Sequence, residues 1–413
     1  YKPENEPRTL GDIFRISKNN SGGSANSRKF ALLGDPSMNL ALPQHEIVTT
    51  RINGQEVSAG QIDTIRALQK VTIEGEVRDK SGNLLENFNG ILAPTLFDKR
   101  VQLSTLGQGS DSPVFTYGIQ KNVIFKGRAS VTNGRFTFTF VVPKDINFEF
   151  GPGKISYYAD NQTSTDAAGS SNAVVIGGTD QNALADEQGP QVDVFMNTED
   201  FVYGGLTGPS PTLLVLLEDD NGINIVGNSI GHDLTAVLDE VSQNTFLLND
   251  FYEAELDDYT KGQVRFPLSD LEEGTHSIRV KAWDVANNSS EGFTEFVVAG
   301  NGEVALDHVL NYPNPFIDAT CFQFEHNMEN QEIDVMVQIY TVSGRLIKTI
   351  NERINPISSR LSKDDCIQWD GTDDFGDPLA RGVYVYKVRI RAASEGLQGL
   401  EGESDFEKLV ILR

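Results

Sequence analysis

Cysteine is scarce in this sequence, and a long apolar run is missing. The 413 residues include only two cysteines, too few for a small domain built around several disulfides. No stretch of about 18 apolar residues occurs, so the sequence predicts no transmembrane helix. An initiator methionine and a signal peptide are also missing, and we therefore expect Tyr1 to follow a cleavage or a chosen boundary.

Positive charge is also low. Lys and Arg total 34 against 59 Asp and Glu, a formal net charge of −25. A phosphate backbone would repel such a surface, which argues against nucleic-acid binding. The sequence also has no long Lys/Arg run that could bind an anionic membrane surface. The acidity has two interpretations, divalent-cation sites or a solvated acidic face, and the solvated face is favoured.

Local motifs for catalysis and metal binding are missing as well. The sequence has no HExxH, no CxxC and no paired-histidine spacing, so no zinc site is expected. It has no GxSxG nucleophile elbow, so a serine hydrolase has no support. We expect no metal and no cofactor.

What the sequence does have is the pattern of many short strands. Residues 71–77 alternate with period two, and Phe136, Phe138 and Phe140 line one side of a predicted strand. Asn133-Gly134 before that strand is a strong hairpin signal. The fold class predicted is mainly β, with a short α/β piece at the start followed by three Ig-like β-sandwich domains.

Turn-rich stretches divide the chain into four parts. Residues 1–43 form an α/β segment, residues 44–178 the first sandwich, residues 179–302 the second, and residues 303–413 the third. In the first part, Thr9 and Asp12 predict the start of a helix, and residues 30–33 predict a short strand. One helix and one strand cannot bury a core alone, so we expect Phe14, Phe30 and Leu32 to be buried against either a preceding α/β domain or the next sandwich.

Several longer blocks resemble a known family. These are LLGDPS (32–37), FKGRASVTNGRF (125–136), VPKDI (142–146), GIN (222–224), GHDLTAVLD (231–239), LNDFY (248–252), KAWDV (281–285), NYPNPF (311–316), WDG (369–371) and RGVY (381–384). In this order they resemble the C-terminal region of the gingipain-like (C25) cysteine peptidases that act as cell-surface sortases of the type IX secretion system. The last three blocks alone are shared more widely, by FlgD-like and type IX sorting domains.

The resemblance implies a function for the full-length protein. Such a sortase removes C-terminal sorting domains from secreted cargo and attaches the cargo to anionic lipopolysaccharide, on the extracellular face of the outer membrane. The implied partners are the cargo sorting domains and the outer-membrane barrel protein PorV, contacted by residues 303–413. The family's catalytic Cys–His pair lies upstream of residues 9–18, so no catalytic residue is carried onto this sequence.

Two other functions remain open. A non-enzymatic adhesin or stalk of Ig-like modules would explain residues 44–413 equally well, but it does not explain the LLGDP segment. A secreted gingipain-like protease is a third alternative, against which the blocks of the middle sandwich argue. The sequence preceding Tyr1 would discriminate between these hypotheses, because a sortase needs a Cys and a His there.

The two cysteines are expected to pair. Alternation places Phe322 inward and Cys321 and Gln323 outward, and it places Cys366 outward beside Ile367. Both thiols then lie on the polar side of sheets in one domain, and outside the cytoplasm neighbouring thiols oxidise. We therefore predict a Cys321–Cys366 disulfide; the alternative is two unrelated thiols on non-adjacent strands.

Two acidic loops and one histidine have open interpretations. Residues 219–222 and 370–374 contain enough carboxylates to hold calcium, but Asp-Asn-Gly is also an ordinary turn, which we favour. His232 beside Asp233 allows a metal or catalytic role, but a hydrogen-bonded turn histidine is the more frequent case.

Overall fold

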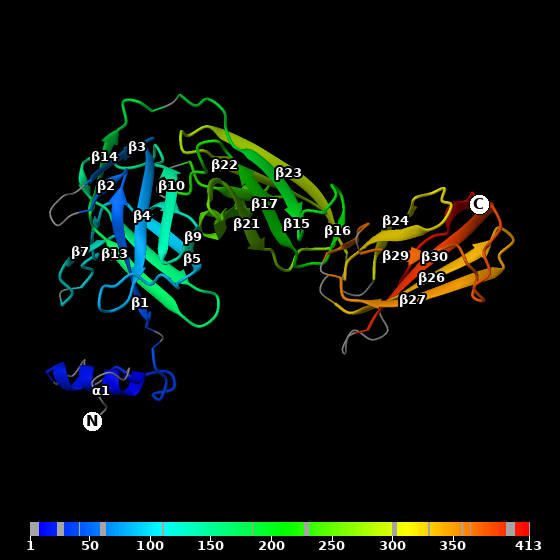
Figure 1. Ribbon diagram of the computed structural model, residues 1–413, viewed down its shortest axis with the longest axis horizontal. Helices are drawn as coiled ribbons and strands as arrows, with labels where there is room; N and C mark the ends of the chain where they lie inside the picture. The colour runs from blue at the N-terminus through cyan, green and yellow to red at the C-terminus, as the bar shows by residue number, and fades with distance from the viewer. Residues whose placement is uncertain are drawn as a thin grey trace.

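The computed structural model describes residues 8–22, 29–40, 42–57, 63–109, 111–183, 185–226, 231–299, 304–328, 331–356, 358–363, 365–393 and 401–412. Three β domains follow one another along the molecule, and the helix α1 lies apart from them next to the N-terminal end (Figure 1). The chain is mainly β, as the sequence predicts.

The helix α1 (Leu10–Asn20) begins where the sequence predicts. The side chain of Thr9 accepts a hydrogen bond from the Asp12 N–H, which caps the first turn. The segment after the helix folds back on this end, because Leu10 and Gly11 donate their N–H groups to the carbonyls of Met38 (2.8 Å) and Pro36 (2.9 Å).

The rest of the N-terminal segment differs from expectation. No strand forms at residues 30–33, because no other described strand lies alongside to pair with it. Burial against the first β domain is not observed: Phe30 is 70% exposed, Phe14 and Leu32 are only half-buried, and α1 has no buried residue. The first β domain does not cover this apolar surface.

The first β domain has a sheet that closes on itself. In order along the sheet, its strands are β12 (Lys154–Asp160), β13 (Asp166–Ser171), β1 (His45–Ile52), β4 (Lys70–Arg78), β10 (Arg135–Val141), β9 (Ala129–Thr132), β5 (Gly90–Phe97) and β8 (Val123–Lys126), with β2 (Gln55–Glu56) beside β1. The strand β5 also pairs with β12, which completes the circuit. The pairing of β5 with β12 therefore closes one edge of the expected sandwich.

Smaller sheets complete the domain. They are β11 (Gly151–Pro152), β14 (Val174–Thr179) and β3 (Asp63–Ala67) in one sheet, and β6 (Val101–Ser104) and β7 (Thr116–Ile119) in a hairpin. The predicted turn before β10 is present, with φ of 52° at Asn133 and 73° at Gly134. Phe136, Phe138 and Phe140 all point into the core, as their alternation predicts.

The second β domain is a sandwich of two sheets with its own core. One sheet has the order β15 (Gln191–Met196), β17 (Thr212–Glu218), β21 (Asp258–Pro267), β20 (Tyr252–Glu255); the other has β16 (Leu206–Thr207), β23 (Ser289–Val298), β22 (Gly274–Trp283), β18 (Thr235–Leu238), β19 (Thr245–Leu247). Two 3₁₀ turns, Ser242–Asn244 and Asn249–Phe251, flank β19. The predicted boundary between the second and third sandwiches, at residues 302 and 303, lies outside the described residues.

The third β domain is also built from two sheets around a separate core. The strands of one sheet are β24 (Leu306–Tyr312), β25 (Thr320–His326), β28 (Arg360–Leu361) and β29 (Ile367–Trp369); those of the other are β27 (Leu346–Ile354), β26 (Ile333–Thr341), β30 (Gly382–Ala392), β31 (Glu401–Glu403) and β32 (Glu407–Ile411). Among the described residues, no helix has the length and apolar character needed to cross a bilayer.

Candidate functional site

Asp145 is a centre of hydrogen bonding at the junction between the first and second β domains. Asp145 follows β10 in the first domain, and its carboxylate accepts hydrogen bonds from three side chains of the second. The donors are Asn287 Nδ2 (2.7 Å), His232 Nδ1 (2.8 Å) and Asn224 Nδ2 (2.9 Å). Next to it, the Lys144 N–H donates to the Val285 carbonyl at 2.8 Å. We refer to Asp145 and its three donors as the Asp145 clasp.

A second group of contacts joins the same two domains. Asp257 of the second domain accepts from the N–H and the Oγ of Ser130, both at 2.6 Å. Its own N–H donates to the Arg128 carbonyl. The Lys70 ammonium lies 5.6 Å from the centre of the Tyr259 ring, a favourable cation–π geometry. The two domains therefore meet through specific polar contacts.

His232 belongs to this junction. Besides bonding Asp145, its ring lies 4.4 Å from the Trp283 ring, and its side chain is 29% exposed. The histidine is hydrogen-bonded, as the favoured interpretation supposed, but its partner lies in another domain. No cysteine is among its hydrogen-bond or ion-pair partners.

Beside the junction, three aspartates from separate segments converge. Asp186 comes from the segment that links the two domains, Asp219 from the turn after β17, and Asp284 from the end of β22. One carboxylate oxygen of each lies within 4.8 Å of the others. Asp219 is 8% exposed and Asp284 is fully buried. We refer to these residues as the aspartate cluster.

Burial and nearby negative charge raise the pKa values of Asp219 and Asp284. Burial raises the pKa of Asp219 to about 6; the Asn221 and Gly222 N–H groups oppose this rise, and the charge on Asp284 adds to it. Burial likewise raises the pKa of Asp284 above its ordinary range, although hydrogen bonds from Asn288 oppose the rise. Both shifts express the cost of holding like charges close together away from water.

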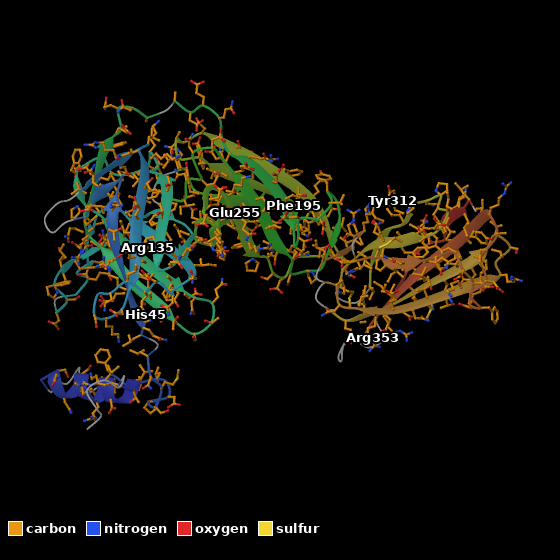
Figure 2. All side chains as sticks on the ribbon, in the orientation of Figure 1. His45, Arg135, Phe195, Glu255, Tyr312 and Arg353 are labelled. Carbon is orange, nitrogen blue, oxygen red and sulfur yellow. A yellow bond between two sulfur atoms is a disulfide. The ribbon has the colours of Figure 1, made fainter. Side chains whose placement is uncertain are left out.

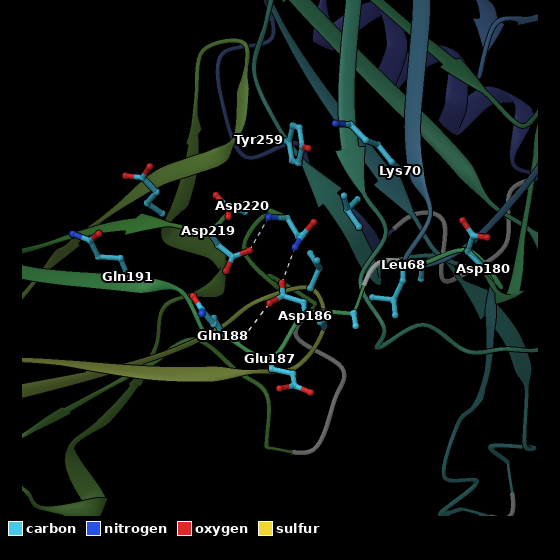
Figure 3. A pocket seen from close by; sticks show the side chains of 18 of the residues that line it. Leu68, Lys70, Asp180, Asp186, Glu187, Gln188, Gln191, Asp219, Asp220 and Tyr259 are labelled. Carbon is cyan, nitrogen blue, oxygen red and sulfur yellow. Dashed lines mark hydrogen bonds between the residues drawn. The ribbon is translucent and has the colours of Figure 1, made fainter.

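The aspartate cluster borders a cavity between the two domains. The cavity has a volume of about 1050 Å³ and is lined on one side by Leu68 and Lys70 of the first domain. Figure 3 shows Asp186 and Asp219 beside each other at this cavity. The Nδ2 atom of Asn221 donates a hydrogen bond to Asp186 at 2.6 Å. A small polar ligand or a hydrated ion would fit in this space.

The second acidic loop forms a turn at the surface. In residues 370–374, Asp373 accepts from the N–H groups of Phe375 and Asp377, each at 2.9 Å. Asp374 accepts from Thr349 and lies 3.9 Å from the Lys348 ammonium. These carboxylates therefore have backbone donors, and Asp374 also lies near a lysine ammonium.

The two cysteines form the disulfide that alternation led us to expect. Cys321 and Cys366 have Cα atoms 5.6 Å apart, and Figure 2 shows the sulfur–sulfur bond within the third domain. Cys321 lies in β25, and Cys366 directly precedes β29, the strand that pairs with β25. Because both cysteines of the sequence are in this bond, the chain offers no thiolate nucleophile.

One neighbour of Cys321 differs from expectation. Gln323, expected on the outer face, is 8% exposed, and Glu325 on the same face is 5% exposed. The second domain reaches this face, since a Cβ atom placed on Gly205 would lie 3.3 Å from Glu325 Oε2. The outer face of β25 is therefore partly covered by a neighbouring domain.

Sequence reasoning missed most of the junction. Asp145 and Asp284 occur in quoted blocks that predict no role for them, and Asp186 lies in a turn-rich stretch near the start of the second predicted sandwich. The contacts join positions far apart in sequence, such as Asn287 and Asp145, 142 positions apart. No local pattern carries such a signal.

No protein-family model matches the chain, and no curated protein matches it. Among solved structures, the dimeric latent PorU of Porphyromonas gingivalis is 29% identical over 98% of this chain, with a TM-score of 0.42. The match spans 38% of that PorU chain.

Other structural similarities are distant. Fibronectin(III)-like modules of Clostridium thermocellum CbhA match 54% of this chain and 93% of their own length, at 8% identity and a TM-score of 0.21. The FN1–FN3 domains of chicken CNTN1 match 85% of this chain and 96% of their own length, at 10% identity and a TM-score of 0.21. No argument rests on these two similarities. The chain is thus similar to part of PorU in sequence, and its domains are β sheets packed around separate cores.

Proposed function

We propose that this chain is the C-terminal region of a PorU-like cell-surface sortase, in which the three β domains support the peptidase domain and attach the enzyme to the outer surface. The observation that carries the proposal is the 29% identity to PorU over 98% of the chain. The quoted blocks, in the same order along all four parts of the sequence, point the same way. The superposition, with a TM-score of 0.42, adds nothing to this argument.

In this proposal the chemistry belongs to a domain that precedes Tyr1. A cysteine thiolate attacks the peptide carbonyl before the cargo's sorting domain, and a histidine protonates the departing amine. An amine of the lipopolysaccharide then displaces the sulfur, which forms an amide and regenerates the thiol. The present chain does not supply the thiolate, because both of its cysteines are in the disulfide.

The uncovered surface of α1 supports a preceding domain. An isolated helix of 11 residues is marginal in water, and here Ile13, Phe30 and Leu33 are exposed. In the proposed full-length protein these side chains pack against the α/β peptidase domain. If the protein were an adhesin or stalk of Ig-like modules, this apolar segment would have no domain to pack against.

The third domain is the proposed attachment element, with the barrel protein PorV as its partner. Deleting residues 304–413 from the full-length protein is expected to release an active enzyme into the medium. The measurement is peptidase activity and immunoblotting of the medium and cell fractions. A chain in which the third domain is replaced by an unrelated Ig-like domain of similar size is the matched control, and it is expected to be released too.

Retention of both altered chains on the cells would contradict the attachment role. The adhesin alternative makes a different prediction, because the sequence preceding Tyr1 would then hold no Cys and His in an α/β domain. Reading that sequence separates the two functions at little cost.

A further inference from the structure

We propose that one end of the third domain docks on a lipid surface that carries anionic phosphate headgroups. The docking surface is the apolar patch, which we define as the exposed side chains Val342, Leu346, Val383, Phe406 and Leu412. The proposal goes beyond the attachment to a barrel protein proposed above. It stands on the surface of the third domain alone.

The apolar patch begins with a continuous row of side chains across one sheet. Tyr340 of β26 is paired with Leu346 of β27 on one side and with Val385 of β30 on the other. Phe406 joins the row, because the centre of its ring lies 5.6 Å from the centre of the Tyr340 ring. The row therefore extends from β27 to the start of β32.

A second row lies nearer the end of the same sheet. Val383 of β30 is paired with Val410 of β32. Val342 lies in the turn that follows β26 and is 73% exposed, and Leu412 directly follows β32 and is 57% exposed. The two rows together make one apolar surface.

Alternation explains why these side chains lie outside the core. Ile339 of β26 and Tyr386 of β30 point into the core of the third domain. Their neighbours Tyr340 and Val385 must then point to the outer face of the sheet. The outer face of an antiparallel sheet that meets water is normally polar, so this end of the sheet is unusual.

The other half of the same outer face is charged, as expected for a solvated sheet. Arg389 forms an ion pair with Glu403, and Arg391 forms one with Glu401. The face is thus divided into a charged half and an apolar half. An exposed apolar patch bordered by polar residues marks a site of interaction with a protein or a membrane.

The apolar patch lies at an end of the molecule. Figure 1 shows the C-terminus at the end of the third domain that is farthest from the second domain, and Leu412 is next to the terminal residue. Val342 projects from a turn at this end. Projecting apolar side chains can enter a fluid lipid surface, which needs no preformed pocket to receive them.

Three basic residues surround the apolar patch, and we refer to them as the basic rim. Arg345 directly precedes Leu346, Arg381 directly precedes β30, and Lys408 is paired with Val385. All three are exposed, and none forms an ion pair with a described residue. Unpaired cations around an apolar surface are complementary to a lipid surface that bears phosphate groups.

Neighbouring carboxylates leave the basic rim uncompensated. Glu407 alternates with Lys408, so it lies on the side of the core residue Leu409. Asp374 accepts a hydrogen bond from the Thr349 N–H beside β27. At physiological salt a charge acts over about 8 Å. The basic rim therefore matters more for docking than the formal net charge of −25.

A second copy of the chain suits the apolar patch less well. In a two-fold dimer the same surface of each protomer meets itself. The basic rims of the two protomers would then approach each other, and like charges across an interface repel. An acidic protein surface is the remaining alternative, and the experiment below separates it from lipid.

The test mixes the whole purified chain with lipid vesicles in the absence of any partner protein. The chain is expected to sediment with phosphatidylcholine vesicles that contain about 30% phosphatidylglycerol, and much less with pure phosphatidylcholine. Binding should weaken in about 0.5 M NaCl, because salt screens the basic rim. Failure here would leave the attachment to a barrel protein untouched, because the deletion of residues 304–413 tests that role on cells.

Variants of single exposed residues assign the binding to this surface. Val342→Asp should lower vesicle binding at least about tenfold, because a carboxylate would have to enter the apolar part of the lipid surface. Val241→Asp is the matched control, since Val241 is a 43% exposed valine of the second domain. Arg381→Gln should weaken binding to anionic vesicles about fivefold. Arg391→Gln, in the charged half of the same face, should bind nearly as the unaltered chain does.

A fluorescence measurement distinguishes insertion from adsorption by charge alone. Val342→Trp should show a blue shift of its emission when anionic vesicles are added, because the indole leaves water. Val241→Trp should show no shift. Near-ultraviolet circular dichroism should be the same for the Asp and Gln variants and the unaltered chain, which separates a loss of binding from a loss of folding.

Three results would overturn the proposal. One is the absence of binding to anionic vesicles at low salt, which would leave an acidic protein as the partner of the patch. Another is a Val342→Asp variant that binds vesicles as tightly as the unaltered chain. The third is a dimer of the unaltered chain that Val342→Asp abolishes, which would assign the apolar patch to a second copy.

Discussion

His326 is a fully buried histidine at the end of β25 in the third domain. Its Nδ1 accepts a hydrogen bond from the Met328 N–H at 3.1 Å, and no described residue pairs with its Nε2. Burial lowers the pKa of His326 to about 4. The imidazole is therefore neutral in the folded protein at neutral pH, and a proton binds the unfolded chain more readily than the folded one.

Acid should therefore destabilise the third domain through His326. The stability that the neutral ring permits is present above about pH 6.5 and is lost as the pH falls toward 4, by up to about 3 kcal/mol. His326→Asn keeps an acceptor for Met328 and should reduce this loss. Urea unfolding at neutral and acidic pH measures the difference between the variant and the unaltered chain. Equal acid sensitivity of both proteins would contradict this role.

His276 serves as a control, because its pKa is shifted in the opposite direction to that of His326. Burial lowers its pKa, but hydrogen bonds to the Glu272 carbonyl and to Asp239 outweigh burial, so the pKa of His276 is raised. Its contribution is fully present at acidic pH and is lost as the pH rises through the folded-state pKa. His276→Asn should therefore lower stability more at acidic pH than at alkaline pH, the reverse of the His326 result.

Single residues were predictable from sequence where their role was local. The pairing of Cys321 with Cys366 and the cap at Thr9 follow from alternation and from a short motif, and both contacts are present. The burial of Gln323 and Glu325 did not follow, and at Glu325 the second domain approaches the face, through Gly205. Alternation tells which face a side chain lies on, but it does not tell whether that face meets water.

The strand β10 is the element in which sequence and structure agree most directly. Phe136, Phe138 and Phe140 follow one another on its inner side, and the ring of Phe140 stacks on Phe125 with centroids 4.3 Å apart. The aromatic rings thus link β10 to β8 across the closed sheet. Such pairs add to the apolar area that the rings bury.

Phe140→Ala should strongly destabilise the first domain. The ring is 1% exposed, so its loss leaves a cavity, and the expected cost is about 3–5 kcal/mol. Thr137→Ala on the exposed side of the same strand is the control, with an expected change of about 0.5 kcal/mol or less. Denaturant unfolding of both variants measures the costs. A small effect of Phe140→Ala would show that the core collapses around the missing ring.

The N-terminal segment shows why elements are harder to predict when their partners are missing. The helix α1 carries its own start signal and formed where expected. The strand at residues 30–33 did not form, because a strand needs hydrogen bonds from a neighbour. A local apolar run therefore predicted a strand that only another strand could stabilise.

At the scale of the molecule, the Asp145 clasp should decide how the first two domains are oriented. Asp145→Ala would leave His232, Asn224 and Asn287 without their common acceptor, at a cost of about 1–3 kcal/mol for each buried group left unpaired. We expect greater interdomain motion and faster proteolysis of residues 179–190. Small-angle scattering and limited proteolysis measure these effects.

The matched control is Asp334→Ala, which removes an exposed ion pair with Arg353 in the third domain. Exposed pairs contribute about 1 kcal/mol or less, so the junction should be unaffected. Unchanged scattering and cleavage in Asp145→Ala would show that the remaining contacts, such as Asp257 with Ser130, hold the junction alone.

The disulfide has a mechanical consequence for a protein with its domains in series. Cys321 and Cys366 are 45 positions apart, and an extended residue spans at most about 3.6 Å. When tension pulls the chain ends apart and the third domain yields, about 160 Å of polypeptide inside this covalent loop cannot lengthen. The loop carries β26, β27 and β28, so these strands bear no pulling force. A tether ending in this domain would stay short under load, even after its sheets had separated.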